Sequence, residues 1–295
     1  MSVHSETNTA RAKLALSMFI FGTIGIFRRG IVLPSSFIAM VRAVVGTAFL
    51  LCLILMKRQK IDGNAVKKNL LLLILSGVLL GFNWILLFEA YQYTSVATAT
   101  LCYYMAPIFI ILASPLLLKE KLTLRKGVCV AVALGGMVLV SGFLESGIGS
   151  ISEMKGVLLG LAAAVFYASV VLLNKNICDI TAYDKTVMQL GIAAAVLLPY
   201  TYFTEDWGSL VFGGNTIVML LIMGIVHTGF AYALYFGTTR ALSAQTLALF
   251  SYIDPIVAVL LSALVLKEPM SFLTLAGAVA VLGSTIVSEL PEKNR

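Results

Sequence analysis

Long apolar runs alternate with short polar stretches along the whole chain. A helix that crosses a lipid bilayer needs about 20 mostly apolar residues, and ten segments meet or approach that requirement. We predict membrane-spanning helices over residues 13–28, 36–56, 69–91, 95–118, 126–143, 156–174, 184–203, 215–237, 243–266 and 272–289. The connections between them are brief, so the pattern predicts an all-α membrane protein without an inserted soluble domain.

One apolar run occurs twice. YMAPIFIILASPLLLKE begins at Tyr104, and YIDPIVAVLLSALVLKE begins 148 residues later at Tyr252, with nine of 17 positions identical. Matches at nearly the same offset extend over five predicted helices, so we expect two halves, 1–146 and 147–295. An odd number of crossings makes the two copies run through the membrane in opposite senses, giving an inverted repeat typical of secondary transporters. The alternative is that duplication only enlarged a helical bundle.

Composition and charge agree with a membrane protein. The chain is 60% hydrophobic and 12% charged, whereas soluble domains are about half apolar and about a quarter charged. With the N-terminus inside, 16 Lys and Arg residues fall on inner segments and four on outer loops, which predicts cytoplasmic termini. We expect a multi-pass protein of a bacterial inner membrane that contacts lipid and binds no nucleic acid. The four scattered cysteines indicate neither a disulfide framework nor a metal site.

Several motifs resemble those of EamA-type permeases of the drug/metabolite transporter superfamily. They are RRGIVLPSSFIAMVRAVVGTAFLL, with Pro34 eight residues before Arg42, and the related segments AP…LLLKEKL…G and DP…LVLKEPM…G. The resemblance covers essentially the whole chain. It implies ten helices, a central cavity between the two halves, and export or exchange of small metabolites, and it leaves the solute open.

An acid stands in only one copy of the repeat. Asp254 precedes Pro255 near the middle of the ninth span, whereas Ala106 precedes Pro107 in the fourth. Proline cannot donate a backbone hydrogen bond and disfavours helical geometry at the preceding residue, so both prolines predict hinges. Ionisable residues inside a membrane are costly and usually functional, which makes Asp254 the first substrate-binding candidate. The alternative is that Asp254 caps a broken half-helix or bonds a neighbouring hydroxyl.

Three more ionisable residues lie within predicted spans. His227, in the eighth span, is either a group that handles protons near neutral pH or a satisfied packing residue. Glu89, towards the outer end of the third span, is either a substrate ligand or an interfacial carboxylate. Arg42, in the second span, either holds a carboxylate in a fork of hydrogen bonds or extends its side chain to the membrane surface.

Polar and aromatic residues near these positions complete the candidate site. They are Asn83, Trp84, Tyr104, Gln189, Gln245 and Tyr252. Such a lining suits amphiphilic organic solutes, although tyrosine and tryptophan near helix ends also form interfacial belts. Glycine-rich faces in the fifth and tenth spans predict close helix packing and a candidate homodimer surface.

Charges of both signs inside the membrane favour a zwitterionic solute, because an α-amino acid needs a partner for each of its charges. We therefore predict a secondary transporter of small polar or zwitterionic metabolites, with amino acid export as the first hypothesis and proton coupling left open. The alternatives with the same architecture are a multidrug or organic-cation exporter and a lipid-carrier flippase. No GxxxxGK[ST], HExxH or GxSxG motif occurs, so we expect no direct ATP use, no enzymatic activity and no cofactor.

Overall fold

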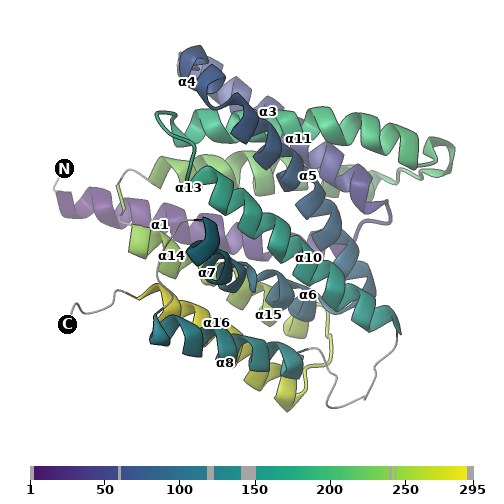
Figure 1. Ribbon diagram of the computed structural model, residues 1–295. Coiled ribbons are helices and arrows are strands. Elements are labelled where there is room, and N and C mark those ends of the chain that lie inside the picture. Colours follow the sequence, from purple (N-terminus) through teal and green to yellow (C-terminus); the bar gives the residue numbers. More distant parts are fainter. Residues whose placement is uncertain are drawn as a thin grey trace.

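The computed structural model describes residues 3–58, 61–117, 123–140, 151–238, 241–242 and 244–290, and all regular structure in these ranges is helical (Figure 1). The helices of the first half are α1 (Val3–Gly22), α2 (Ile24–Arg29), α3 (Ser35–Met56), α4 (Gly63–Lys68), α5 (Leu70–Tyr93), α6 (Val96–Tyr103), α7 (Ala106–Leu117) and α8 (Leu124–Val140). Those of the second half are α10 (Ile151–Asn174), α11 (Ala182–Thr204), the 3-10 helix η1 (Trp207–Ser209), α12 (Gly214–Gly224), the π-helix η2 (Ile225–Phe230), α13 (Ala231–Thr238), α14 (Ala244–Ser251), α15 (Ile253–Leu264) and α16 (Phe272–Glu289).

Helices occupy the predicted spans. Within the described ranges, seven helical segments, some of them with an internal break, are long and apolar enough to cross a membrane, and they match predicted spans one to four and six to eight. The other three predicted spans correspond to shorter segments, namely α8, α14 with α15, and α16. Helices are the form in which an apolar chain satisfies its backbone in lipid, so the chain is an integral multi-pass membrane protein.

The structure differs from the predicted spans at some helix starts and in one connection. α1 begins at Val3 instead of residue 13, because hydropathy locates the part of a helix that lies in lipid and not the end of the helix. The connection KRQKIDGNAVKK is not a plain loop, since it contains α4. Asp62 begins α4 by accepting hydrogen bonds of 3.0 and 3.1 Å from the backbone N–H groups of Asn64 and Ala65, which are otherwise left without partners at a helix start.

One pair of helix breaks follows the sequence repeat. α6 and α7 are separated at Tyr104 and Met105, and α14 and α15 are separated at Tyr252, 148 residues after Tyr104. Pro107 and Pro255 lie in the first turn of the helix that follows each break, where the missing N–H of proline leaves no hydrogen bond unmade. The proposed hinge prolines therefore begin half-helices and do not kink continuous ones.

Packing between helices shows the same internal symmetry (Figure 1). α5 packs along α10, and their repeat counterparts, α13 and α1 respectively, also pack together. α3 contacts α11 and α8 contacts α16, so each of these four helices meets its own counterpart in the repeat, whereas α6 contacts α15, whose counterpart is α7. Several helices that correspond in the sequence repeat therefore pack against each other.

α8 and α16 approach each other through glycine. A Cβ atom added to Gly277 would lie 2.6 Å from the backbone oxygen of Gly136, and one added to Gly136 would lie 2.9 Å from that of Gly277. The two backbones are therefore in contact, which glycine permits. Gly135 and Gly283, on the same two helices, would place a Cβ at least 4 Å from every neighbouring atom among the described residues.

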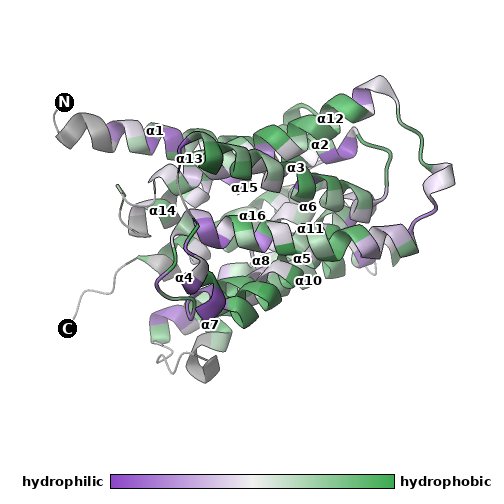
Figure 2. Cartoon of the chain, turned by 90° about the horizontal axis from the view of Figure 1, so that it is seen from above, coloured by the Kyte–Doolittle hydropathy of each residue, from purple (hydrophilic) through white to green (hydrophobic). Residues whose placement is uncertain are grey.

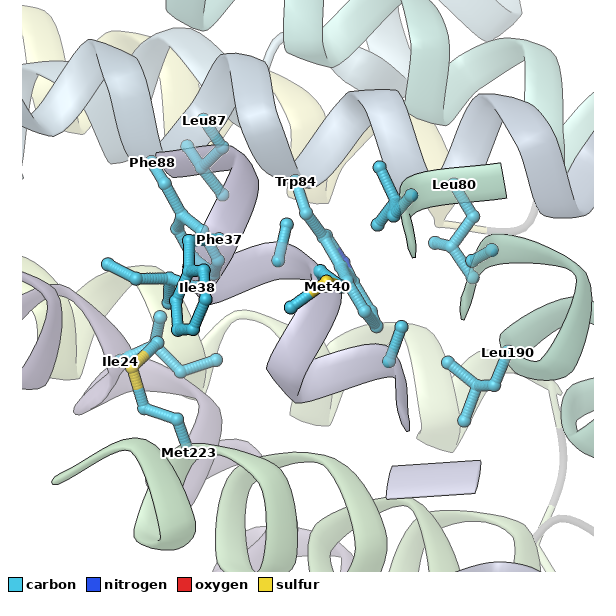
Figure 3. Close-up of a cluster of buried hydrophobic side chains, with 14 of the residues drawn as sticks. Ile24, Phe37, Ile38, Met40, Leu80, Trp84, Leu87, Phe88, Leu190 and Met223 are labelled. Atoms are coloured by element: carbon cyan, nitrogen blue, oxygen red, sulfur yellow. The ribbon is translucent and has the colours of Figure 1, made fainter. Parts of the chain in front are cut away.

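Apolar residues cover the outside of the molecule as well as its interior. Figure 2 shows hydrophobic residues along the long helices and hydrophilic ones at α4. Leu71 and Val279 are 69% and 67% exposed, which fits a surface facing lipid. The main buried cluster includes Trp84 and Phe88 of α5 and Leu190 of α11 (Figure 3). The guanidinium group of Arg42 lies over the rings of Trp84 and Phe88.

Candidate functional site

A carboxylate and a phenol meet where two broken helices pack together. Tyr104 follows the last residue of α6, and its hydroxyl donates a hydrogen bond of 2.7 Å to Oδ2 of Asp254. Asp254 stands in the first turn of α15. Among the described residues Tyr104 is the only hydrogen-bond partner of the Asp254 side chain, so this carboxylate bonds across the two halves and not within its own helix.

The surroundings of this pair are only partly closed. Asp254, Tyr104 and the preceding Tyr103 each keep part of their surface accessible, although the pair lies between α6 and α15 in the interior of the helical bundle. A buried carboxylate with no exposed surface could not receive a solute. Asp254 is therefore not sealed from its surroundings.

Arg42, on α3, is held in one pose by stacking and by a hydrogen bond. Its guanidinium carbon lies 4.2 Å from the centre of the Trp84 ring and 5.6 Å from that of Phe88, which is a cation–π arrangement. Its Nε donates a hydrogen bond of 2.7 Å to Oγ1 of Thr228. Within the described ranges this is the hydrogen bond of the Arg42 side chain, so the two terminal nitrogens, which form the fork that binds carboxylates, are unused.

Arg42 and Asp254 carry opposite charges when both are ionised, and no ion pair joins them in the part of the chain that the structure describes. Each is instead satisfied by a neutral hydroxyl, Thr228 for Arg42 and Tyr104 for Asp254. The arrangement therefore separates two charges, each with capacity for a further partner.

The π-helix η2 positions Thr228 and also His227. Single π turns inside longer helices often occur at functional sites. Nε2 of His227 lies 2.8 Å from Oγ1 of Thr23, in the break between α1 and α2, and Nδ1 lies 3.3 Å from the backbone oxygen of Ile222. The Thr23 hydroxyl also lies 2.8 Å from the backbone oxygen of Ile20, to which it donates, and because a hydroxyl has one proton, Nε2 accepts from Thr23 only when that bond to Ile20 is given up. His227 thus links η2 to the first helix break.

The sequence matches the profile of the EamA-like transporter family twice, over residues 12–142 and 154–289. The chain belongs to this family. A Bacillus subtilis protein named uncharacterized transporter YxxF is 33% identical over 260 residues, covering 87% of this chain and 81% of YxxF. The PecM protein of Dickeya dadantii is 28% identical over 220 residues, covering 73% of this chain and 72% of PecM. A solved crystal structure superposes with a TM-score of 0.66 at 19% identity, covering 95% of this chain and 96% of that one.

These likenesses confirm the EamA-type identification made from the repeated motifs. The chain is therefore a membrane transporter. The solved structure agrees with the overall helical fold, and it carries no argument about the solute.

Asn83 and a set of tyrosines adjoin the Asp254–Tyr104 pair in this EamA-like protein. Nδ2 of Asn83 donates a hydrogen bond of 2.6 Å to the backbone oxygen of Ala163. The Tyr103 hydroxyl donates to Oδ1 of Asn83 at 3.4 Å. The Tyr103 ring packs against Tyr104 and against Tyr167 of α10, with centroid distances of 6.1 and 5.4 Å. Asn83 therefore orients the aromatic surface next to the carboxylate.

Two predicted site residues have partners elsewhere. Gln189, 5% exposed, donates hydrogen bonds of 2.6 Å to Oγ of Ser76 and to Oδ1 of Asn174, so it ties α11 to α5 and α10. Glu89 accepts a hydrogen bond of 2.6 Å from Ser35. These contacts join neighbouring helices and give both residues structural roles in this conformation.

The structure leaves one candidate undescribed and adds two residues. The side chain of Gln245 lies outside the described residues, and Tyr252, which is 5% exposed, occupies the break before α15. Thr228 and Thr23 were not singled out from the sequence, although they hold Arg42 and His227. A threonine in an apolar run commonly bonds its own helix backbone, so the sequence offered only a weak signal for either residue.

Proposed function

We propose that this EamA-like chain is a secondary transporter that moves small polar or zwitterionic metabolites by alternating access, with amino acid export as the first hypothesis. The observation that carries the proposal is the Asp254–Tyr104 contact between broken helices, set near the unused fork of Arg42. These groups bind and release charged solutes without any bond being made or broken, so we propose transport and no catalysis.

In this proposal the two charges receive the two ends of an α-amino acid. The ammonium group replaces the Tyr104 hydroxyl on Asp254, and the carboxylate takes two hydrogen bonds from the terminal nitrogens of Arg42. Stacking on Trp84 keeps the guanidinium in plane, so little side-chain freedom is lost when the solute binds. When no solute is bound, Tyr104 satisfies the carboxylate, and a proton on Asp254 would serve the same end.

We further propose that the halves 1–146 and 147–295 are inverted repeats of five spans each, with both termini in the cytoplasm. The symmetric packing of α5 on α10 and of α13 on α1 supports this arrangement, as does the excess of Lys and Arg on inner segments. The helix breaks at Tyr104 and Tyr252 provide equivalent bending points in the two halves. Inverted halves can rock about a fixed site and expose it to either face in turn.

A second candidate function is export of organic cations. Asp254 is partly accessible and has Tyr103, Tyr104 and Tyr167 nearby, whereas Arg42 is 4% exposed. Acids combined with aromatic faces bind ammonium groups, so the accessible part of the site favours a positive charge. A lipid-carrier flippase would need free cationic groups at headgroup depth, and the outer Arg28 is instead buried and bonded to Ser35.

Binding and flux assays separate these functions. A thermal-shift screen of the purified protein against amino acids, organic cations and other metabolites identifies ligands, because a solute that binds only the folded state raises the melting temperature. Uptake of the labelled hits into proteoliposomes then measures transport. The proposal expects saturable flux of at least one zwitterion. Flux of cations alone would establish the second candidate, and a folded protein that moves neither class would contradict both.

A further inference from the structure

A second polar contact between α6 and α15 lies at the opposite end of α6 from Tyr104. Glu268 follows α15, and its Oε2 accepts a hydrogen bond of 2.8 Å from the backbone N–H of Val96, the first residue of α6. Ser262, within α15, also donates to this oxygen. A carboxylate at a helix start satisfies a backbone donor that the helix itself leaves unpaired. Asp254 and Glu268, from one segment, thus hold both ends of α6.

Arg29, in the first half of the chain, binds the same carboxylate, that of Glu268. Its terminal nitrogen lies 2.9 Å from Oε1 of Glu268 and donates a hydrogen bond of 2.7 Å to the backbone oxygen of Thr94, just before α6. The Arg29 side chain is 33% exposed and that of Glu268 is 14% exposed. Arg29 is the last residue of α2. The ion pair therefore bridges residues 239 positions apart, at an end of the molecule that water can reach.

The backbone brings these segments together at this end. A Cβ atom added to Gly25 of α2 would lie 2.3 Å from Cγ1 of Val96, so α2 and α6 already touch. Lys267 has a φ of 53°, an uncommon conformation for a residue with a side chain, and it turns the chain so that Glu268 points back at α6. For a path to open between the halves at this face, Glu268 must lose its contacts with both Arg29 and Val96.

We propose that Arg29 and Glu268 form a latch, the outer latch, that closes the transport path at the end of α2 and releases once in each transport cycle. This inference rests on the proposed alternating access. Tyr104 directly follows α6, which begins at Val96. A solute that takes Tyr104 away from Asp254 therefore leaves the bond from Val96 to Glu268, the acid of the outer latch, as the remaining polar contact between α6 and the segment of α15 among the described residues. Solute binding and opening at this face are coupled through α6.

Accessibility labelling without any solute tests the outer latch. Tyr103→Cys, in a background with Cys52, Cys102, Cys129 and Cys178 replaced, provides a thiol at the end of α6. A membrane-impermeant maleimide is applied to one face at a time, in intact cells and in inverted vesicles. We expect Arg29→Gln and Glu268→Gln each to raise the labelling rate by about threefold, only from the face that carries Glu268, which the charge pattern places outside. Lys267→Gln removes a neighbouring exposed charge and should leave the rate unchanged.

A double substitution tests whether the Arg29–Glu268 contact is what limits the labelling rate. Residues that act through one contact are not additive, so Arg29→Gln with Glu268→Gln should label no faster than the faster single variant. Additive rates, equal rates from both faces, or no change in any variant would overturn the latch. Hydrogen exchange across residues 96–103 in a chain with its native cysteines gives a second readout, with faster exchange expected in both single variants and not in Lys267→Gln.

The labelling and flux experiments can fail separately. Unchanged labelling with saturable wild-type flux would remove the outer latch and leave the transporter standing. Faster labelling from one face, in a protein that moves no tested solute, would support the outer latch and contradict the proposed function.

Discussion

The Tyr104 hydroxyl lies 2.7 Å from Oδ2 of Asp254 and joins the first half of the chain to the second at the break of α6 and α7. The repeat predicts an equivalent pair, Tyr252 with residue 106, but alanine at 106 cannot accept that bond. The tyrosine–carboxylate bond therefore forms between Tyr104 and Asp254, and the equivalent bond between Tyr252 and residue 106 does not exist. This asymmetry gives a duplicated scaffold a single carboxylate in its centre, and it is the starting point for three of the four predictions below.

Asp254→Asn should abolish most transport without unfolding the protein. The amide still accepts a hydrogen bond from Tyr104, but it cannot balance an ammonium group, so we expect flux to fall at least about tenfold. Proteoliposome flux and the melting temperature are measured together. Asp206→Asn, in the loop before η1, removes a carboxylate that serves a local turn and should retain wild-type flux. Wild-type flux in Asp254→Asn would assign Asp254 a structural role.

Tyr104→Phe should reduce flux less than Asp254→Asn does. It removes the hydroxyl that holds the empty carboxylate and keeps the aromatic ring, so we expect a loss of about three- to tenfold. Residues in one network couple, so the double variant with Asp254→Asn should transport no worse than Asp254→Asn alone. Independent, multiplying losses would show that Tyr104 acts apart from the carboxylate.

Arg42→Gln should distinguish a zwitterion from a cation. For an amino acid it removes the partner of the carboxylate, and we expect the KM to rise about tenfold or more. For an organic cation it removes a repelling charge, so the KM should stay equal or fall. Arg42→Lys keeps the charge and loses the fork and the stacking on Trp84, and should restore little zwitterion transport. An unchanged KM for amino acids in Arg42→Gln would exclude Arg42 as their ligand.

Gly277→Ala and Gly283→Ala should have opposite effects on stability although both lie on α16. The added Cβ at position 277 meets the Gly136 backbone at 2.6 Å, which should cost about 1–3 kcal/mol by overpacking. At position 283 there is room, and alanine in a helix is favoured over glycine by about 0.5–1 kcal/mol. Melting temperatures in detergent should fall for the first and hold or rise for the second. Equal shifts would contradict the glycine contact between α8 and α16.

The positions of the apolar segments could be predicted from the sequence because transfer of a segment into lipid depends on its own composition. Predicted spans two, three and seven agree with α3, α5 and α11 to within a few residues. α4 was missed because a short polar helix begun by Asp62 leaves no apolar signal. The break at Tyr104 was foreseen only as a kink near Pro107, since the proline restricts its neighbours without stating where the helix will part.

The candidate site was predictable as a list of residue types and not as a set of contacts. Asp254 stood out because a charge in lipid is costly whatever surrounds it. Glu89 stood out for the same reason and Gln189 as a polar residue within a span, yet both are satisfied by partners on neighbouring helices. Thr228 gave little signal, because its role depends on a π turn that brings it to Arg42, 186 residues away.

The sequence by itself determined that this chain crosses a membrane many times, that it is built from a duplicated unit, and that only one copy carries a central acid. These properties are local or come from comparing the chain with itself. Only the tertiary structure decided that Tyr104 meets Asp254, that Arg42 keeps its fork unused, and that Arg29 reaches Glu268. Such contacts join residues 150 to 239 positions apart, and their geometry depends on how whole helices pack, which no single segment encodes.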